Sequence, residues 1–233
     1  MLCGGETEMD SETKRLHSAS ATHIFNALKL EIALGILHPK QRLIESELVE
    51  KFASHRPAVR EALGMLAQVG LVVQTPHKGS AVAELTRDKL EKIYQMRIEL
   101  ECLAVAWMTL PLAEQQMTQI KKTFEAHAEA LHDRQFKDIF RLNAQFHQQI
   151  NQHCGNPHLE EMIEVMSARG LLARFSTAMT HEFLCDVERD HLEIVQAMEA
   201  CDRQRLVSVM HRHNVRGRDW YAAAIEQREV QCN

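Results

Sequence analysis

The chain has 233 residues, 45% of them hydrophobic, and a formal net charge of −5 with histidine neutral. A chain of this length can bury two modest cores. No stretch reaches the roughly 18 to 20 uninterrupted apolar residues of a membrane helix, and residues 1–17 lack the apolar core of a secretion signal. The six cysteines form no CxxC pair and are expected to be reduced thiols. We therefore expect a soluble, cytoplasmic protein with no membrane partner.

Charge alone gives little support for binding to nucleic acid, because phosphate contacts need clustered Lys and Arg. Residues 20–85 carry seven basic and six acidic side chains, a net charge of +1, against −6 for the rest of the chain. A role in DNA binding must therefore be argued from the positions of individual basic residues.

The N-terminal part predicts three helices and a strand hairpin. Residues 1–19 contain two adjacent glycines and no apolar periodicity, which is typical of a flexible tail. Helices are predicted over about 21–35, 44–52 and 57–69, with Pro57 in the first turn of the third helix and Gly70 just after its end. Strands over 71–75 and 80–84 flank a turn at 76–79. This order predicts a winged helix-turn-helix.

From residue 86 onward the sequence predicts only helices, because Gly and Pro are sparse and no strand pattern recurs. The expected helices are 87–109, 112–132, 135–153, 157–179, 184–200 and 203–226. The predicted fold class is therefore mainly α, with a tail over 1–19, a winged helix-turn-helix over 20–85 and an all-helical bundle of about six helices over 86–231.

The third predicted helix carries two arginines near its start. Val59, Leu63 and Leu66 form its apolar stripe, which leaves Arg56 and Arg60, one turn apart, on another face. A recognition helix inserts its N-terminal end into the major groove, where Arg contacts guanine or phosphate. An isolated pair of arginines is more often simply solvated, so both interpretations remain open here.

The predicted wing tip offers a second cationic feature. Its residues His77, Lys78 and Gly79 supply a cation and a position without a side chain. The missing side chain would let the backbone approach the minor groove or its phosphates.

The N-terminal segment resembles the DNA-binding domain of the GntR family of bacterial regulators. The matching runs are residues 30–39, 42–45, 70–72, 78–82 and Arg56-Pro57-Ala58-Val59-Arg60-Glu61-Ala62-Leu63. The resemblance implies that Arg56 and Arg60 contact DNA, and we expect the remaining contacts from Lys78, Gly79, His77 and Arg42. Lys40 departs from the usual glycine. His55 departs from a common capping serine and leaves the cap to Ser54 or water.

In the helical part, Arg97 falls on an apolar stripe with Leu90, Ile93, Leu100 and Ala104. A guanidinium group that faces a core needs a compensating anion. That anion could be an internal carboxylate from elsewhere in the bundle or the carboxylate of a bound ligand.

Three predicted helices place a histidine at an inward position. Asn143 and His147 lie four residues apart on one helix, His191 precedes an apolar stripe, and His213 continues another. Three imidazoles and an amide oxygen can bind a divalent transition metal and leave positions open. Since the chain has 14 histidines and no HExxH signature, a metal site and structural histidines remain equal alternatives at this point.

The helical part also looks like the FCD ligand-binding domain of the FadR branch of the GntR family. The matching runs are residues 97–101, 143–147, 155–159, 191–198 and 210–213. The resemblance implies that Asn143, His147, His191 and His213 hold a divalent transition metal, with Zn or Ni favoured and Mn as the alternative. Asn143 stands where Asp is commoner, which removes one negative charge and weakens the site.

The same resemblance places Arg97 near the effector pocket, where a carboxylate ligand would complete the metal shell. Arg169 and Arg174 are further effector-binding candidates, although arginines on amphipathic helices are usually solvated. We hypothesise a homodimeric transcriptional repressor, not an enzyme, that binds a double-stranded DNA operator and responds to a small carboxylate effector. The alternatives are a helical metalloenzyme acting on a small carboxylate and a metal-free regulator of the same fold.

Overall fold

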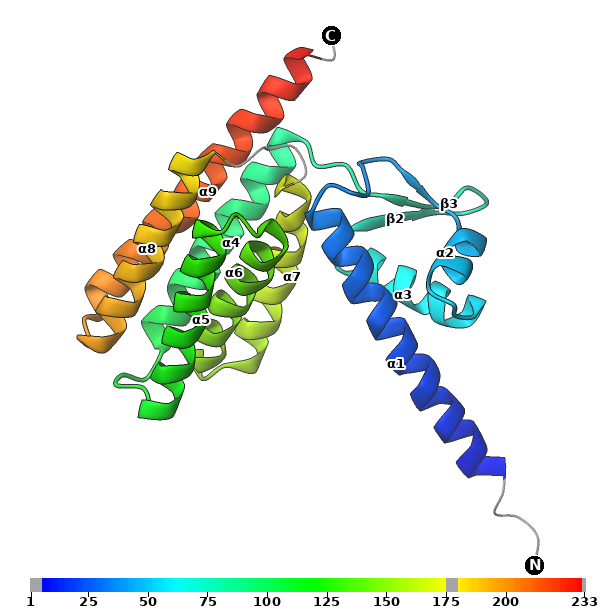
Figure 1. Cartoon of the computed structure of the whole chain (residues 1–233), viewed down its shortest axis with the longest axis horizontal. Coiled ribbons are helices and arrows are strands. Elements are labelled where there is room, and N and C mark those ends of the chain that lie inside the picture. The colour runs from blue at the N-terminus through cyan, green and yellow to red at the C-terminus, as the bar shows by residue number, and fades with distance from the viewer. Residues whose placement is uncertain (1–5, 175–179, 232–233) are drawn as a thin grey trace, which may run out of the picture. The chain divides into compact units, whose positions relative to one another are not determined.

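The computed structural model describes residues 6–174 and 180–231, with side chains for residues 20–173 and 180–227. The chain divides into two compact units, Met1–Glu84 and Leu85–Asn233. The N-terminal unit contains the elements α1 (Glu6–Ala33), β1 (Arg42–Leu43), α2 (Glu45–Lys51), α3 (Arg56–Gln68), β2 (Val72–Thr75) and β3 (Gly79–Val82) (Figure 1).

The N-terminal unit is the predicted winged helix-turn-helix. α1 packs against α3. The two helices bury apolar side chains that include Ile24 and Leu28 from α1 and Leu63 and Leu66 from α3. The strands form one antiparallel sheet in the order β1-β3-β2. The pairing of β1 with β3 could not be foreseen, because a strand of two residues shows no alternation of apolar and polar side chains.

The first helix is longer than predicted. α1 begins at Glu6, so the prediction of a flexible tail over residues 1–19 is wrong for the backbone of residues 6–19. This stretch has no Gly or Pro after Gly5 and contains strong helix formers, which favour extension of an existing helix even without an apolar stripe. Residues 1–5 lie outside the described residues.

The C-terminal unit is a helical bundle, which confirms the mainly α fold class. It contains α4 (Arg87–Trp107), α5 (Glu114–His132), α6 (Phe136–Asn151), the short 3-10 helix η1 (Gln152–Cys154), α7 (Pro157–Arg174), α8 (His181–Glu199) and α9 (Arg203–Gln231). α4 contacts α6, α7 and α9, while α5 packs against α6 and α8 (Figure 1). Among the described residues, no helix is both long and apolar enough to span a bilayer.

Two glycines of the bundle lie where neighbouring helices come close together. A Cβ atom at Gly170 of α7 would lie 3.2 Å from Nη1 of Arg97, and one at Gly217 of α9 would lie 3.4 Å from Cε1 of Tyr94. Both contacted side chains belong to α4. The glycines therefore leave room for a large cationic side chain and a large aromatic one inside the bundle.

We expect the core around Phe146 to dominate the stability of the bundle. Phe146 is fully buried, and its ring centroid lies 4.5 Å from that of His191. Phe146→Ala should lower the free energy of unfolding by about 3 to 5 kcal/mol, because it removes buried apolar surface and leaves a cavity. Urea unfolding followed by far-UV circular dichroism measures the change.

The matched control for this prediction is Phe136→Ala at the start of the same helix. The Phe136 side chain is 48% exposed, so its removal should cost less than about 1 kcal/mol. Equal losses of stability in the two variants would contradict the proposed core.

Candidate metal centre and nucleic-acid interface

The start of α3 presents its cationic face to solvent. Arg56 and Arg60 are exposed, while Val59, Leu63 and Leu66 are buried. Nε of Arg60 donates to both carboxylate oxygens of Glu45 in α2, at 3.0 and 2.9 Å. The two Nη groups of Arg60 take no part in these hydrogen bonds. The two arginines are therefore exposed together at the start of α3, and Arg60 is oriented by a carboxylate of the neighbouring helix α2.

The wing is a tight turn between β2 and β3. The amide of Lys78 donates to the carbonyl of Thr75 at 3.0 Å, and His77 and Gly79 have φ angles of 63° and 83°. A Cβ atom at Gly79 would meet nothing within 4 Å, so the positive φ angle, rather than crowding, favours glycine here. Nη2 of Arg42 donates to the carbonyl of Lys78 at 2.9 Å and ties β1 to the wing tip.

Lys40 and His55, the two residues that depart from the pattern of the resembled DNA-binding domain, each show a distinct local structure. Lys40 has a φ angle of 65°, a left-handed conformation that glycine adopts readily. Its ammonium group pairs with Glu84 at 2.8 Å. His55 is the N-cap of α3 and makes no side-chain capping bond. The hydroxyl of Ser54 lies 2.8 Å from that of Ser20, so Ser54 is engaged with α1.

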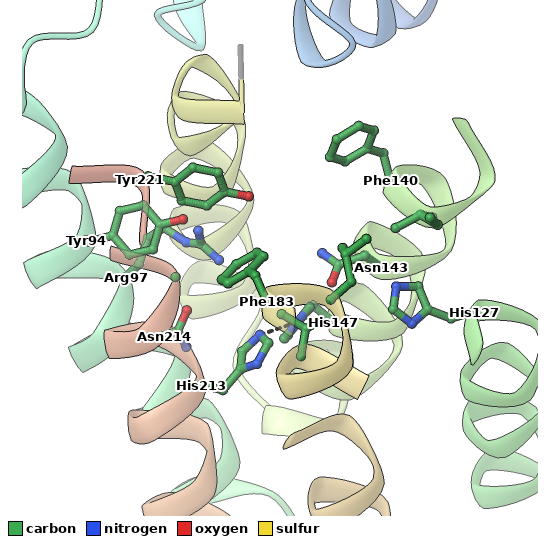
Figure 2. Close-up of a pocket in the computed structure, with 14 residues that line it drawn as sticks. Tyr94, Arg97, His127, Phe140, Asn143, His147, Phe183, His213, Asn214 and Tyr221 are labelled. Carbon is green, nitrogen blue, oxygen red and sulfur yellow. Dashed lines mark hydrogen bonds between the residues drawn. The ribbon is translucent and has the colours of Figure 1, made fainter. Parts of the chain in front are cut away.

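In the helical unit, three of the predicted metal ligands come together. His147 of α6, His191 of α8 and His213 of α9 each offer a ring nitrogen, and these atoms all lie within 4.8 Å of one another. The Nε2 atoms of His147 and His213 are 3.1 Å apart, and Figure 2 shows the two rings facing each other. Donor atoms around a tetrahedral zinc ion are separated by about 3.3 Å, so the cluster has the dimensions of a metal site.

His191 is buried at the centre of the cluster. Burial lowers the pKa of His191 well below its ordinary value, and the imidazoles of His213, His147 and His127 lower it further. The ring is therefore neutral near pH 7, as a metal ligand must be. Neither ring nitrogen of His191 has a hydrogen-bond partner among the described residues. A buried imidazole without a partner is costly, and a bound cation would satisfy it. The donor set therefore fits a divalent transition metal.

Two buried carboxylates lie near the cluster, on the Nδ1 side of two of its rings. Oε2 of Glu101 lies 3.8 Å from Nδ1 of His147, and Oδ2 of Asp190 lies 3.8 Å from Nδ1 of His213. A carboxylate that accepts a hydrogen bond from a metal-ligating histidine fixes its ring orientation and raises its basicity. At 3.8 Å these two carboxylates lie within ion-pair range of the rings but beyond hydrogen-bond length. Glu101 and Asp190 are thus the carboxylates that lie next to the candidate metal ligands.

Asp190 is kept ionised by two arginines of α9. It accepts two hydrogen bonds from Arg212 at 2.9 and 3.0 Å and one from Nε of Arg216 at 2.9 Å. Burial by itself raises the pKa of Asp190, but the nearby His213 and the hydrogen bonds from Arg216 and Arg212 outweigh this effect and lower that pKa to about 2. These contacts hold α8 against α9 at the level of His191 and His213.

A cavity of about 50 Å³ adjoins the cluster (Figure 2). Its wall includes His147, His213, Arg97 and Asn143. Asn143 therefore lines the same cavity as two of the histidines with which it was grouped. The cavity is small, so only the smallest ligands match it in volume.

Arg97 is nearly buried and has an internal anion. Its side chain is 12% exposed and pairs with Glu101, one turn further along α4. The guanidinium carbon also lies 4.8 Å from the centroid of the Tyr94 ring. Burial by itself lowers the pKa of Arg97, but Glu101 and Tyr94 raise it above its ordinary value. Of the two anions that the sequence left open, the structure shows an internal carboxylate, and it comes from the same helix.

Arg169 of α7, the second effector-binding candidate, does not line this cavity. Its Nε is buried with no hydrogen-bond partner in the part of the chain that the structure describes. The side chain of Arg174 lies outside the described residues.

Four residues of the site were not predicted from sequence, namely Glu101, His127, Asp190 and Asn214. His127 of α5 is buried, lines the cavity and has its ring centroid 5.1 Å from that of His191. It continues the buried stripe of Ile120 and Thr123, a spacing that could have revealed it. The other three stand in sequence next to, or one turn from, residues that were predicted.

Comparison with known proteins assigns families to both parts of the chain. Residues 92–216 match the FCD domain, and residues 20–82 match the family described as bacterial regulatory proteins, gntR family. The transcriptional regulator McbR of Escherichia coli is 29% identical over 199 residues, which cover 84% of this chain and 90% of McbR. The transcriptional repressor RspR of Escherichia coli is 26% identical over 193 residues, covering 82% of this chain and 83% of RspR.

A shorter match and a solved structure agree with this assignment. The HTH-type regulator YdhC of Bacillus subtilis is 32% identical over 141 residues, 60% of this chain and 63% of YdhC. The structure of Escherichia coli McbR superposes with a TM-score of 0.78 at 24% identity, covering 90% of this chain and 98% of McbR. This structural likeness shows that the two proteins share a fold.

We expect the contacts of Asp190 to make it the most important ion-pairing residue between α8 and α9. Asp190→Ala should lower the free energy of unfolding by about 2 to 3 kcal/mol, because two arginines lose a buried partner. The cost stays below that of a fully buried pair, since Arg212 and Arg216 are partly in solvent. Urea unfolding followed by circular dichroism measures it.

Asp138→Ala serves as the control for this variant. Asp138 pairs with Arg141 within α6, and both side chains are well exposed. Its removal should cost less than about 1 kcal/mol. A loss as large as that of Asp190→Ala would show that burial does not set the strength of the α8–α9 pairs.

Proposed function

Because the chain belongs to the GntR family of bacterial transcriptional regulators and carries an FCD domain, we propose that it is a homodimeric repressor controlled by a small carboxylate effector. The named relatives regulate transcription and are not enzymes, and RspR is named a repressor. The function is therefore regulation rather than catalysis. The three-histidine cluster carries the proposed response to an effector, because two of its rings line the same cavity as Arg97.

In the proposed mode of DNA binding, two copies of the winged helix read the two halves of a pseudo-palindromic operator. The exposed start of α3 supports this role, since Arg56 and Arg60 extend from the end of the helix that enters the major groove. Lys78, Gly79, His77 and Arg42 would contact the flanking minor groove or phosphates. Binding to chromosomal DNA would place the protein in the cytoplasm.

In the proposed sensor, His147, His191 and His213 hold a divalent metal and Asn143 supplies an amide oxygen. An imidazole-rich set suits Zn or Ni better than Mn, which prefers oxygen ligands. The bound metal would supply a Lewis-acidic position for an effector carboxylate. Glu101 and Asp190 orient the imidazoles from behind, and Arg97 offers a second cationic contact on the cavity wall.

An effector can change operator affinity only by preferring one arrangement of the protein over another. Regulation of the usual strength requires a coupling free energy of roughly 1 to 3 kcal/mol between the two sites. The cluster joins α6, α8 and α9, so a ligand bound beside it would act on the packing of three helices at once.

The DNA-binding proposal predicts that the double variant Arg56→Ala/Arg60→Ala loses operator affinity. Two arginine contacts are together worth at least about 2 kcal/mol, so the affinity should fall by roughly 30-fold or more. Fluorescence anisotropy on an operator selected from random duplexes with the wild-type protein measures the change. Arg141→Ala/Arg189→Ala, which removes two exposed arginines of the helical unit, should leave affinity unchanged. Wild-type affinity in the α3 variant would refute the proposed interface.

The metal proposal predicts that protein purified without a nickel column contains about one transition metal ion per chain. His147→Ala and His213→Ala should each reduce this content to a small fraction, because each removes a ligand. Mass spectrometry of the elements gives both the amount and the identity of the metal. His211→Ala alters an exposed histidine of α9 and should retain the metal. Metal retained after His147→Ala and His213→Ala would exclude the cluster as its site.

A further inference from the structure

Glu101 links the arginine of the cavity to a histidine of the cluster. Its side chain is fully buried, and its two oxygens have different partners. Oε1 accepts hydrogen bonds from Nε and Nη2 of Arg97, at 3.0 and 2.8 Å. Oε2 accepts a hydrogen bond from Nδ2 of Asn214 at 3.1 Å and lies 3.8 Å from Nδ1 of His147. A single carboxylate thus connects the candidate effector contact to the candidate metal site.

The ion pair with Glu101 uses only part of the guanidinium group of Arg97, which leaves the rest for a ligand. Both described hydrogen bonds to Glu101 end on one oxygen, and Nη1 of Arg97 takes no part in them. The guanidinium group lies on the cavity wall, so a small anion in the cavity could reach it. Such an anion would add a second carboxylate beside Glu101. Two carboxylates that share one guanidinium in a site largely shielded from water repel each other, so they compete for it.

The contacts to His147 and Asn214 give Glu101 a second role. Carboxylates behind metal-bound imidazoles strengthen metal binding, and their loss typically costs 10- to 100-fold in affinity. Asn214 follows His213 directly in α9, and its amide also donates to the carbonyl of Met210 at 3.2 Å. Oε2 of Glu101 therefore lies between side chains of α6 and α9, next to His147, one of the three clustered histidines.

We propose that Glu101 is a positioning residue with two opposed effects, orienting His147 for the metal and competing with the effector carboxylate for Arg97. This inference rests on the proposed function and adds a specific mechanism to it. An effector that draws Arg97 away weakens the hold on Oε1, and the displacement is transmitted through Asn214 to α9.

The test is Glu101→Gln, which removes the negative charge and keeps the shape of the side chain. Zn²⁺ affinity, measured by competition with a chromophoric chelator, should weaken by about 10-fold or more. Acetate affinity, measured by NMR titration of the metal-free full-length chain, should instead strengthen several-fold, because Arg97 loses its internal competitor. Opposite changes in the two affinities are not expected from general damage to the fold, which would weaken both.

Matched controls accompany this variant. Glu99→Gln neutralises an exposed glutamate two residues away in α4 and should change neither affinity. Arg97→Gln should abolish acetate binding, and uncharged acetamide should not bind the wild type. A wild-type chain that binds neither Zn²⁺ nor acetate contradicts the proposed function itself. If the wild type binds both, any result for Glu101→Gln other than opposite changes overturns the role assigned to Glu101.

Discussion

The helical unit depends on one constraint, which is that three imidazoles and two carboxylates must coexist inside an apolar bundle. Each of these groups is costly to bury alone. Ion pairs offset the cost of burying the two carboxylates: Glu101 pairs with Arg97, and Asp190 pairs with two arginines of α9. The three imidazoles lie together at one point. These groups come from α4, α6, α8 and α9, so the site joins four helices that also share the apolar core around Phe146. The site is therefore part of the packing of the bundle and not an addition to its surface.

The two units differ in where their paired polar side chains lie. In the N-terminal unit the polar groups stay at the surface, where Arg60 meets Glu45 and Arg42 meets the carbonyl of Lys78. In the helical unit exposed pairs such as Asp138 with Arg141 also occur, but Glu101 and Asp190 are buried and meet side chains of other helices. The first arrangement leaves cationic groups free to meet phosphate or base edges, whereas the second suits a small ligand that is enclosed by the protein.

The fold was predictable because helical periodicity, the Pro57 and Gly70 signals and the turn at 76–79 are local features of the sequence. The three histidines were predictable for the same reason, since each lies on or beside an apolar stripe. Glu101 and Asp190 could not be recognised, because charged residues on helices are usually solvated and only the contacts between helices show that these two are buried. The extension of α1 to Glu6 was missed because a helix without an apolar stripe carries no periodic signal.

The hydrogen bonds from Arg60 to Glu45 also have a consequence for the engineering of the winged helix-turn-helix. Because a residue of α2 holds the guanidinium before any duplex arrives, less side-chain freedom is lost on docking. In the proposed DNA complex, the contact of Arg60 would therefore depend on both α2 and α3. Grafting α3 by itself onto another scaffold would transfer Arg60 without Glu45, so a graft meant to keep the proposed contact would need α2 as well as α3.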